Sequence, residues 1–305
     1  MHARRSAGVA LVVSVALPAL AAVVQPAQAT YPGSNDGRIA FGSEVDGNVD
    51  IYSTLANGEA LHRLTEDPLF DACPAYSADG KRIAWCRGVR ARGGVIEIWT
   101  MKQNGEDERQ LTSLGGRMTF PDFSPDGSKI AFAGRLPGAT NDDVFVVNAD
   151  GSGLVQLTTD PANDNLPAFS PDGSKLVYIS DRSGVSQVWV MDADGTDPQQ
   201  LTFDDVFKVQ VPDWSPDGSQ IAYAVGDPGD IWVMDADGSD AHPVIATSTD
   251  EFGPAWSPDG EQLAFIQFDD RTVYVADADD GGNRYAVHPL GLQAVPAWQP
   301  RGNRP

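Results

Sequence analysis

The two cysteines of the chain, Cys73 and Cys86, are the residues whose spacing points most directly to chemistry. They flank an Asp-Gly pair at 79–80, and Asp-Gly between apolar runs is typical of a tight β-hairpin turn. Counting outward from that turn places Tyr76 opposite Ile83 and Cys73 opposite Cys86. Directly opposed residues of an antiparallel pair have Cα atoms about 4.5–5.5 Å apart, which a disulfide tolerates. We therefore predict a cross-strand disulfide, with two free thiols or a redox pair as the alternatives.

Metal-binding and catalytic patterns are weak. The turns Asp192-Ala-Asp-Gly195 and Asp235-Ala-Asp-Gly238 offer carboxylates, which calcium prefers, but the further acidic ligand and the distal Glu of an EF-hand do not follow. Asp favours such turns on its own account. His62 and His242 are expected on outer strands of different repeats, and the chain has no Gly-x-Ser-x-Gly elbow. We expect no metal, no cofactor and no catalytic residue, so the chain is predicted not to be an enzyme.

A set of arginines is the clearest candidate for binding. Arg87, Arg90 and Arg92 fall in one predicted connection between strands, and the others are spread over later connections, together with two neighbouring residues that we add to the set: Arg135, Arg182, Arg271, Asp71 and Phe120. Guanidinium groups bind carboxylates through two parallel hydrogen bonds. Either these arginines receive a carboxylate or an acidic peptide, or they balance neighbouring aspartates.

The overall charge restricts the partners. The chain has 21 Lys and Arg against 43 Asp and Glu, for a net charge of -22. Nucleic acids are bound through clustered cations on phosphates, so this composition argues against nucleic acid as a partner. It favours solubility, association with cations or a basic partner, and does not choose among them.

The amino terminus reads as an export signal. A basic start at Arg4 and Arg5 is followed by an apolar run from Ala7 to Val24 and by Ala27-Gln28-Ala29. This order is typical of a secretory signal peptide, and an uncleaved membrane anchor is the alternative. We predict a signal peptide over 1–29 and one domain over 30–305, in the periplasm, in the cell envelope or secreted. After removal of the signal we expect no transmembrane segment and a monomer.

One phrase recurs along the rest of the chain. It reads Pro-x-aromatic-Ser-Pro-Asp-Gly, with a weaker first copy and a degenerate last one, and the copies begin at Pro74, Pro121, Pro167, Pro212, Pro254 and Pro296. The starts are 42 to 47 residues apart. A period of about 40–50 residues in a strand-rich chain is typical of β-propeller blades.

Each repeat contains four predicted strands. The first carries the aromatic residue, and the second and third follow the Asp-Gly turn, as in 129–132 and 144–147. The fourth is short and often ends in Leu-Thr. The chain begins partway through a repeat and stops after the first strand of another, at 296–298. Pairing that last strand with the first three would close a ring of six blades and leave no exposed strand edge. The arginine-bearing connections then share one face with the fourth-to-first connections.

The four near-identical Ser-Pro-Asp-Gly copies resemble the repeats of TolB-like propellers over essentially all of 30–305. The resemblance implies an all-β propeller and is not specific for one function. TolB itself carries an amino-terminal α/β domain, for which 30–37 leave no room, so we expect the propeller part alone.

Propellers usually place function in loops held by a rigid scaffold. We therefore expect a non-catalytic scaffold that binds a protein or peptide partner at the loop face or in the channel mouth. A propeller-type lyase or hydrolase that acts on an extracellular carbohydrate or lactone is the alternative.

Overall fold

The structure is a computed structural model, and it describes residues 37–45, 47–89, 94–203, 209–226, 228–288 and 296–300. All of them belong to the larger of two compact units, Gly33–Pro305. The predicted signal peptide lies outside the described residues. Regular structure within them is β-strand throughout. In that part of the chain no helix is long and apolar enough to cross a membrane.

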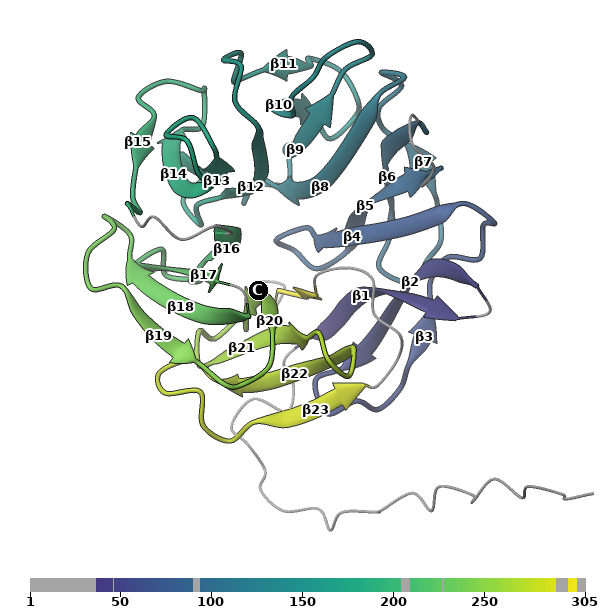
Figure 1. The fold of residues 1–305 in the computed structure, drawn as a ribbon. Helices are drawn as coiled ribbons and strands as arrows, with labels where there is room; N and C mark the ends of the chain where they lie inside the picture. Colours follow the sequence, from purple (N-terminus) through teal and green to yellow (C-terminus); the bar gives the residue numbers. More distant parts are fainter. Residues whose placement is uncertain are drawn as a thin grey trace, which may run out of the picture. The chain divides into compact units, whose positions relative to one another are not determined.

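The strands form antiparallel sheets in chain order (Figure 1). The first sheet contains β1 (Arg38–Val45), β2 (Asn48–Leu55), β3 (His62–Arg63) and, beside β1, β24 (Ala297–Trp298). An eight-stranded sheet contains β4 (Phe70–Tyr76), β5 (Arg82–Gly88), β6 (Ile96–Lys102), β7 (Arg109–Gln110), β8 (Arg117–Phe123), β9 (Lys129–Arg135), β10 (Asp143–Asn148) and β11 (Val155–Gln156). A parallel bridge between β6 and β8 joins its two antiparallel halves.

Three further four-stranded sheets follow. The first of them contains β12 (Asp164–Phe169), β13 (Lys175–Ser180), β14 (Gln187–Asp192) and β15 (Gln199–Gln200). The next contains β16 (Val209–Trp214), β17 (Gln220–Gly226), β18 (Gly229–Asp235) and β19 (His242–Ile245). The last contains β20 (Glu251–Trp256), β21 (Gln262–Gln267), β22 (Thr272–Asp277) and β23 (Tyr285–His288). The all-β expectation is confirmed.

Two sequence phrases explain the local pairing. In Ser-Pro-Asp-Gly, the Ser124 hydroxyl donates to Asp126 Oδ1 at 2.6 Å and accepts from the backbone N–H of Lys129 at 2.9 Å. Gly127 then takes a positive φ of 69°, which glycine adopts without a steric penalty. In Leu-Thr, the Thr158 hydroxyl accepts from the backbone N–H of Val144 on the third strand at 2.9 Å. The repeated serine therefore has a structural partner in the turn.

The core lies between neighbouring sheets. Trp256 of β20 packs with Ala224 and Ile231 of the preceding sheet, and Trp214 of β16 packs with Val177 and Val188 in the same manner. The aromatic residues of the repeat thus pack sheet against sheet. Such burial of large aromatic side chains dominates core energetics.

The last described strand joins the first sheet. Ile39 of β1 is paired with Trp298 of β24. The backbone N–H of Gln299 donates to Arg38 O at 2.8 Å, and the backbone N–H of Arg38 donates to Gln299 Oε1 at 3.0 Å. Residues more than 250 positions apart are therefore held together by backbone and side-chain hydrogen bonds.

The connections define two faces. The first-to-second and third-to-fourth connections lie at one end of the sheets, which we call the turn face. The second-to-third and fourth-to-first connections lie at the other end, which we call the loop face. Hydrogen bonds link the two kinds of loop: Gly229 N donates to Asp250 Oδ1 at 2.6 Å, and Ile96 N donates to Gly116 O at 3.0 Å.

Candidate functional site

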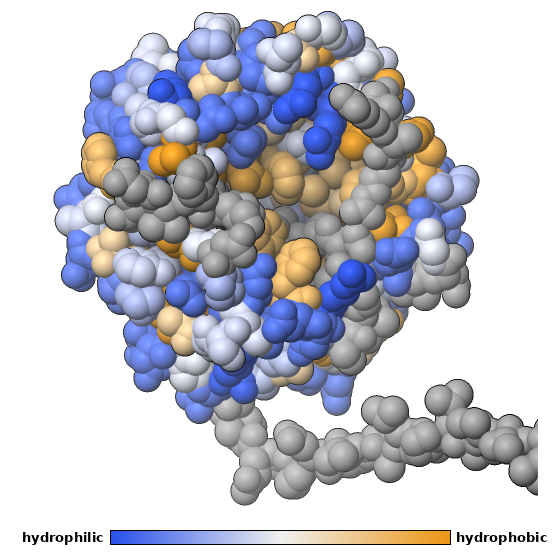
Figure 2. Space-filling model, viewed as in Figure 1, coloured by the Kyte–Doolittle hydropathy of each residue, from blue (hydrophilic) through white to orange (hydrophobic). Residues whose placement is uncertain are grey.

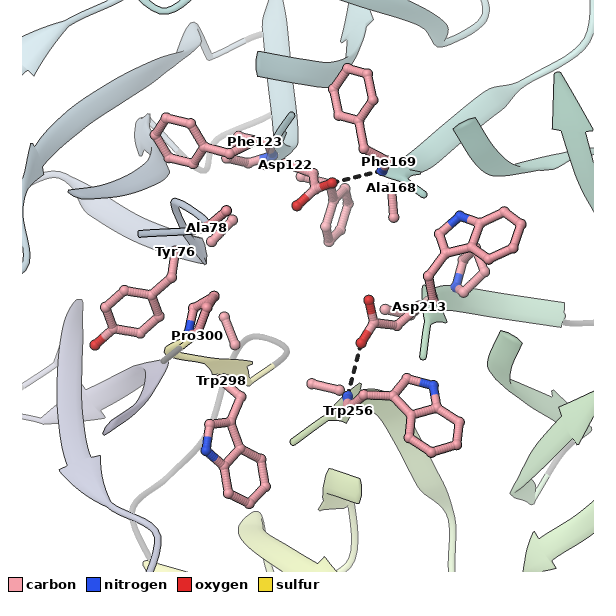
Figure 3. A pocket seen from close by; sticks show the side chains of 18 of the residues that line it. Tyr76, Ala78, Asp122, Phe123, Ala168, Phe169, Asp213, Trp256, Trp298 and Pro300 are labelled. Atoms are coloured by element: carbon pink, nitrogen blue, oxygen red, sulfur yellow. Dashed lines mark hydrogen bonds between the residues drawn. The ribbon is translucent and has the colours of Figure 1, made fainter. Parts of the chain in front are cut away.

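A pocket of about 420 Å³ lies at the centre, where the first strand of each repeat contributes its Pro-x-aromatic residues (Figure 3). The wall is rich in proline, and the lining strands are β4, β8, β12, β16, β20 and β24. Figure 2 shows apolar side chains around the hollow at the centre of the view, with hydrophilic surface outside it. A concave, largely apolar pocket with few polar groups is typical of a small-molecule or side-chain binding site.

The lining strands share a backbone irregularity. In five of these strands, β4, β8, β12, β16 and β20, the pairing shifts register around the proline, as between Thr119 and Asp122. The residue before that proline has a positive φ in five repeats: Cys73, Phe120, Leu166, Val211 and Gly253. A β-bulge bends its strand and redirects a side chain, and a positive φ is unfavourable for bulky residues. The bulges place Phe120, Leu166 and Val211 in the wall of the pocket.

Two carboxylates occupy the same register in alternate repeats of this wall. Asp122 Oδ2 accepts from the backbone N–H of Phe169 at 2.8 Å, and Asp213 Oδ2 accepts from that of Trp256 at 2.8 Å. Each bond reaches the next sheet. The other repeats have alanine at this position, namely at Ala75, Ala168, Ala255 and Ala297. The fold therefore does not require a carboxylate there.

Burial changes the acidity of both groups. It raises the pKa of Asp122 to about 7, with a contribution from the charge of Asp213, and it raises the pKa of Asp213 to about 6. Each residue as a whole is half-buried. Its carboxyl group, however, lies among protein atoms of the pocket wall and loses hydration, which raises its pKa. The pair can bind a cation or exchange protons near neutral pH. These aspartates were not among the residues predicted from the sequence, although Asp and Ala alternate at this position of the repeats.

The Arg87 side chain is buried on the loop-face side of β5. Its Nε and Nη2 donate to Asp71 Oδ1 and Oδ2 at 2.7 and 2.8 Å, and its Nη1 donates to Glu108 at 2.6 Å. The guanidinium also lies 5.2 Å from the Trp85 ring and 4.9 Å from the Trp99 ring. Asp71 is fully buried. Arg87 and Asp71 were expected to face a partner. In the structure both side chains are buried and form hydrogen bonds to each other.

Two other predicted arginines are also paired. Arg182 Nη2 contacts Asp164 at 2.9 Å and Asp160 at 3.0 Å, and Arg135 Nη2 contacts Asp142 at 2.7 Å. Their aspartates belong to the two loop sets, so these guanidiniums balance neighbouring carboxylates.

The remaining loop residues differ in exposure. Arg271 is exposed with a φ of 53°, and Phe120 is half-buried in the pocket wall. Arg90 and Arg92 lie outside the described residues.

Among the described residues, exposed large apolar side chains are more numerous on the loop face than on the turn face. Those in loop-face connections are Leu69, Val89, Val95, Phe203 (75%) and Phe268 (57%). Those on the turn-face side are Leu61, Leu154 and Val155. A contiguous exposed apolar patch marks an interaction surface, whereas single exposed apolar residues are ordinary. The loops were predicted from the sequence and these residues were not, since hydropathy alone does not distinguish an exposed from a buried Phe.

The cysteines do not oppose each other as counted. Tyr76 is paired with Ile83 as predicted, but Cys86 is paired with Ala72, because the bulge before Pro74 shifts the register. That part of the prediction is wrong. Both thiols are free and buried, and a hydrogen bond with Cys73, together with burial, raises the pKa of Cys86. The side chains still meet, so disulfide formation stays a prediction.

The other candidates are satisfied locally. The Asp194 carboxylate accepts from Thr196 and the Asp237 carboxylate from Ser239 within their turns. His62 and His242 lie on β3 and β19, in different sheets. Among the described residues, one acidic group of three has metal-ligand spacing, at Asp277, Asp279 and Asp280, all on one turn and half-buried or exposed.

Comparison with known proteins places this architecture. The TolB beta propeller domain matches residues 108–232. An uncharacterized protein of Agrobacterium fabrum, Atu1656, is 34% identical over 202 residues, which cover 62% of this chain and 67% of that protein. The chain belongs to the TolB-like β-propeller family. The Tol-Pal system protein TolB of Francisella tularensis is 31% identical over 168 residues, 55% of this chain and 37% of that protein. This TolB-like chain thus matches little more than a third of that relative's length.

Solved structures agree on the fold. TolB from Acinetobacter baumannii has a TM-score of 0.75 at 22% identity, covering 88% of this chain and 68% of that chain. A TolB-like structure from Agrobacterium tumefaciens has a TM-score of 0.66 at 20% identity, covering 85% and 93%. The nidogen/laminin complex has a TM-score of 0.70 at 13% identity, covering 86% and 98%. At these identities, the likeness shows the propeller fold alone.

Proposed function

We propose that this TolB-like propeller is a non-catalytic extracytoplasmic scaffold that binds a protein or peptide partner on its loop face. The observation that carries the proposal is the larger number of exposed apolar side chains on that face, led by Phe203 and Phe268. Protein interfaces are enriched in aromatic residues at their centre and polar at their rim. The basic and apolar stretches of residues 1–29 support export, and the relatives of the Tol-Pal system support an envelope role.

A rigid ring is part of the proposal. We infer six blades, of which the first is completed by the pairing of β24 with β1. In such a ring each sheet packs between two neighbours and only the short outer strands keep an open edge, so the loops are held in fixed positions. A fixed face reduces the ordering that binding requires and favours affinity. We expect the scaffold to act as a monomer.

The predicted loop residues divide into two roles in this proposal. Arg87 and Asp71 hold their loops from within, because they are buried together. Arg135, Arg182 and Arg271 lie in loops around the face, and Phe120 lies in the pocket wall below it. Arg90 and Arg92 complete the proposed rim. Rim charges chiefly set the rate and specificity of association, so the apolar residues should carry most of the affinity.

An affinity capture from envelope extracts tests the proposal. The wild-type chain is compared with Phe203→Ala/Phe268→Ala and with a control, Leu154→Ala/Val155→Ala, which removes exposed apolar side chains of the turn-face side. A partner kept by the control and lost by the loop-face variant supports the proposal. Equal capture by both variants contradicts the choice of face.

The Asp122 and Asp213 pair favours a second candidate, a hydrolase. Burial raises the pKa of both carboxyls, and two carboxylates in one pocket are the usual machinery of glycoside hydrolysis. The pocket wall argues against it, because its prolines and alanines offer a sugar few hydrogen-bond partners. Hydrolysis of an aryl glycoside or a lactone by the wild type and its loss in Asp122→Asn would favour the enzyme.

A further inference from the structure

A second cavity, unrelated to the loop face, lies on the turn face between the first sheet and the β4–β7 sheet. Its volume is about 730 Å³. Six basic residues line it: Arg38, His62, Arg63, Lys81, Arg82 and Lys102. The other lining residues are Ser53, Leu64, Gln103 and Asn104, so no acidic side chain of the described residues lines the cavity.

This concentration runs against the composition of the chain. Five of the 21 Lys and Arg residues line one groove of a protein with 43 Asp and Glu. Cations that only offset nearby acids would be spread among them, as Arg135 and Arg182 are on the loop face. A groove lined by one sign of charge instead raises the local concentration of the opposite ion.

The pairing of Arg82 with Lys102 is not explained by the stability of the sheet. The two residues are directly opposed on β5 and β6. At the same register of two other repeats, Lys129 is opposed to Asn148 and Lys175 to Asp192. Like charges directly opposite each other destabilise an antiparallel pair. Two opposed cations are therefore unfavourable for the sheet, and the two other repeats do not have them. Unfavourable local arrangements of this kind are expected at functional sites.

The guanidiniums are fixed in place by neutral groups. Arg38 Nε donates to Ser53 Oγ at 2.9 Å, and Arg82 Nη2 donates to Thr100 Oγ1 at 2.8 Å. Gln299 braces the groove, since its Nε2 donates to Gly80 O at 2.7 Å and to Gln103 Oε1. Within the described part of the chain, neither Arg38 nor Arg82 forms an ion pair. Arg38 Nη2 also donates to Ser53 O at 2.9 Å and to Ala60 O. Both arginines therefore keep their charge for a ligand, and Arg38 keeps the donors of its Nη1.

The remaining cations are less free. Arg63 is bound to the buried Asp50 at 2.6 Å. Lys81 and Lys102 form exposed pairs with Asp79 at 3.2 Å and Glu106 at 3.8 Å, and exposed pairs of this kind contribute little. These two acids stand at the rim of the groove, where they would repel an extended acidic chain. A compact anion that fits between the sheets avoids them.

We propose that this groove binds a compact multivalent anion that carries phosphate groups, such as a diphosphate or a phosphate ester. The planar fork of Arg matches phosphate oxygens, and the ammonium of Lys adds a point charge. The bound anion offsets the repulsion between Arg82 and Lys102. The same phosphate chemistry is offered by a soluble ester and by a lipid headgroup.

Titration calorimetry of the full chain with inorganic pyrophosphate is the test. The variant Arg82→Gln/Lys102→Asn introduces the residues that other repeats have at the equivalent positions, Gln220 and Asn148. The control Lys129→Gln/Lys175→Gln removes two lysines from the same register of two other repeats. We expect saturable 1:1 binding by the wild type and control, and binding about a hundredfold weaker in the variant, since it loses two cations and each lost charge-assisted hydrogen bond is worth about a factor of ten.

A second readout separates ligand binding from a structural role. Because the variant removes a like-charge pair, its urea midpoint without ligand should be at least that of the wild type. Pyrophosphate should raise the midpoint of the wild type and the control only. Vesicles of phosphatidylglycerol, compared with phosphatidylcholine, show whether a lipid phosphate is also accepted.

Three outcomes overturn the proposal. They are the absence of saturable binding, equal loss of binding in the control, and tighter binding of hexaglutamate than of pyrophosphate. The last would identify the groove as a site for an acidic peptide.

Discussion

Asp122 of β8 accepts a hydrogen bond at 2.8 Å from the backbone N–H of Phe169 in β12, 47 residues further along the chain. The bond links the first strands of two neighbouring sheets at the wall of the central pocket. Asp213 and Trp256 repeat the relationship two repeats later. A carboxylate with one oxygen fixed in this way keeps the other for a cation or a proton.

Asp122 should make stability depend on pH. Its native pKa of about 7 exceeds the ordinary value of 3.8, so the native state binds more protons than the unfolded state between these values. The stabilisation is complete below about pH 4 and is lost as the pH rises through 7. Asn at this position can still accept from Phe169 and has no charge. The urea midpoint of Asp122→Asn, relative to that of the wild type, should therefore increase from pH 4 to pH 8.

Asp126→Asn is the matched control, with the opposite sign. Hydrogen bonds from Ser124 and Ser128 lower the pKa of Asp126 to about 2. Its stabilisation is present above about pH 4 and is lost as the pH falls toward 2. The urea midpoint of this variant should be lower than that of the wild type at neutral pH, and the difference should become smaller in acid. A constant difference for both variants would show that neither carboxyl titrates as described.

The repeat was predictable from sequence because its residues act locally. The Ser-Pro-Asp-Gly turn and the Leu-Thr strand end each bond within one sheet, so their spacing carries the information. The register of Cys73 was not predicted correctly, because counting outward from a turn assumes a regular ladder. Pro74 indicates the irregularity, since proline within a paired strand is usual only at edges and bulges.

The candidate sites were harder to predict because they depend on residues far apart in the sequence. A sequence shows that Arg87 lies in a loop and does not show that Asp71 and Glu108 close around it. The basic groove is assembled from β1, β3, β5 and β6, of two different sheets. The Asp122 position, in contrast, could have been found by comparing the repeats at a single register.

The Arg87–Asp71 pair should be important for stability. Removing Arg87 leaves a fully buried carboxylate without its partner, and breaking a buried pair in this way costs about 3–5 kcal/mol. Arg135→Ala is the comparison, because its more exposed pair with Asp142 is worth at most about 1 kcal/mol. Urea unfolding measures both. Similar small losses would show that Arg87 is available to a partner after all.

The cysteines should join when the protein passes through an oxidising compartment. Cys73 and Cys86 are buried side by side, so a disulfide needs little movement. Protein prepared without reductant should take up no alkylating agent after unfolding, and two equivalents after reduction. Two alkylated thiols in the unreduced sample would contradict the prediction.

The serine of the turn should contribute about equally to folding in the repeats that carry the Ser-Pro-Asp-Gly phrase. Ser124→Ala removes the acceptor for the Lys129 N–H and the donor to Asp126, at a cost of about 1 kcal/mol. Ser170→Ala removes the matching bonds in the next repeat and should cost the same. Thermal unfolding checks the two values. A loss of partner binding without a loss of stability would point to a functional serine.

The measurement that tests the scaffold proposal most directly is hydrogen exchange of the chain alone and with its captured partner. We predict slower exchange in the loop-face segments 66–70, 111–116 and 246–250, and unchanged exchange in the turns 78–81 and 125–128. Protection of the turns with no change in the loops would contradict the account, because it would put the partner on the opposite face.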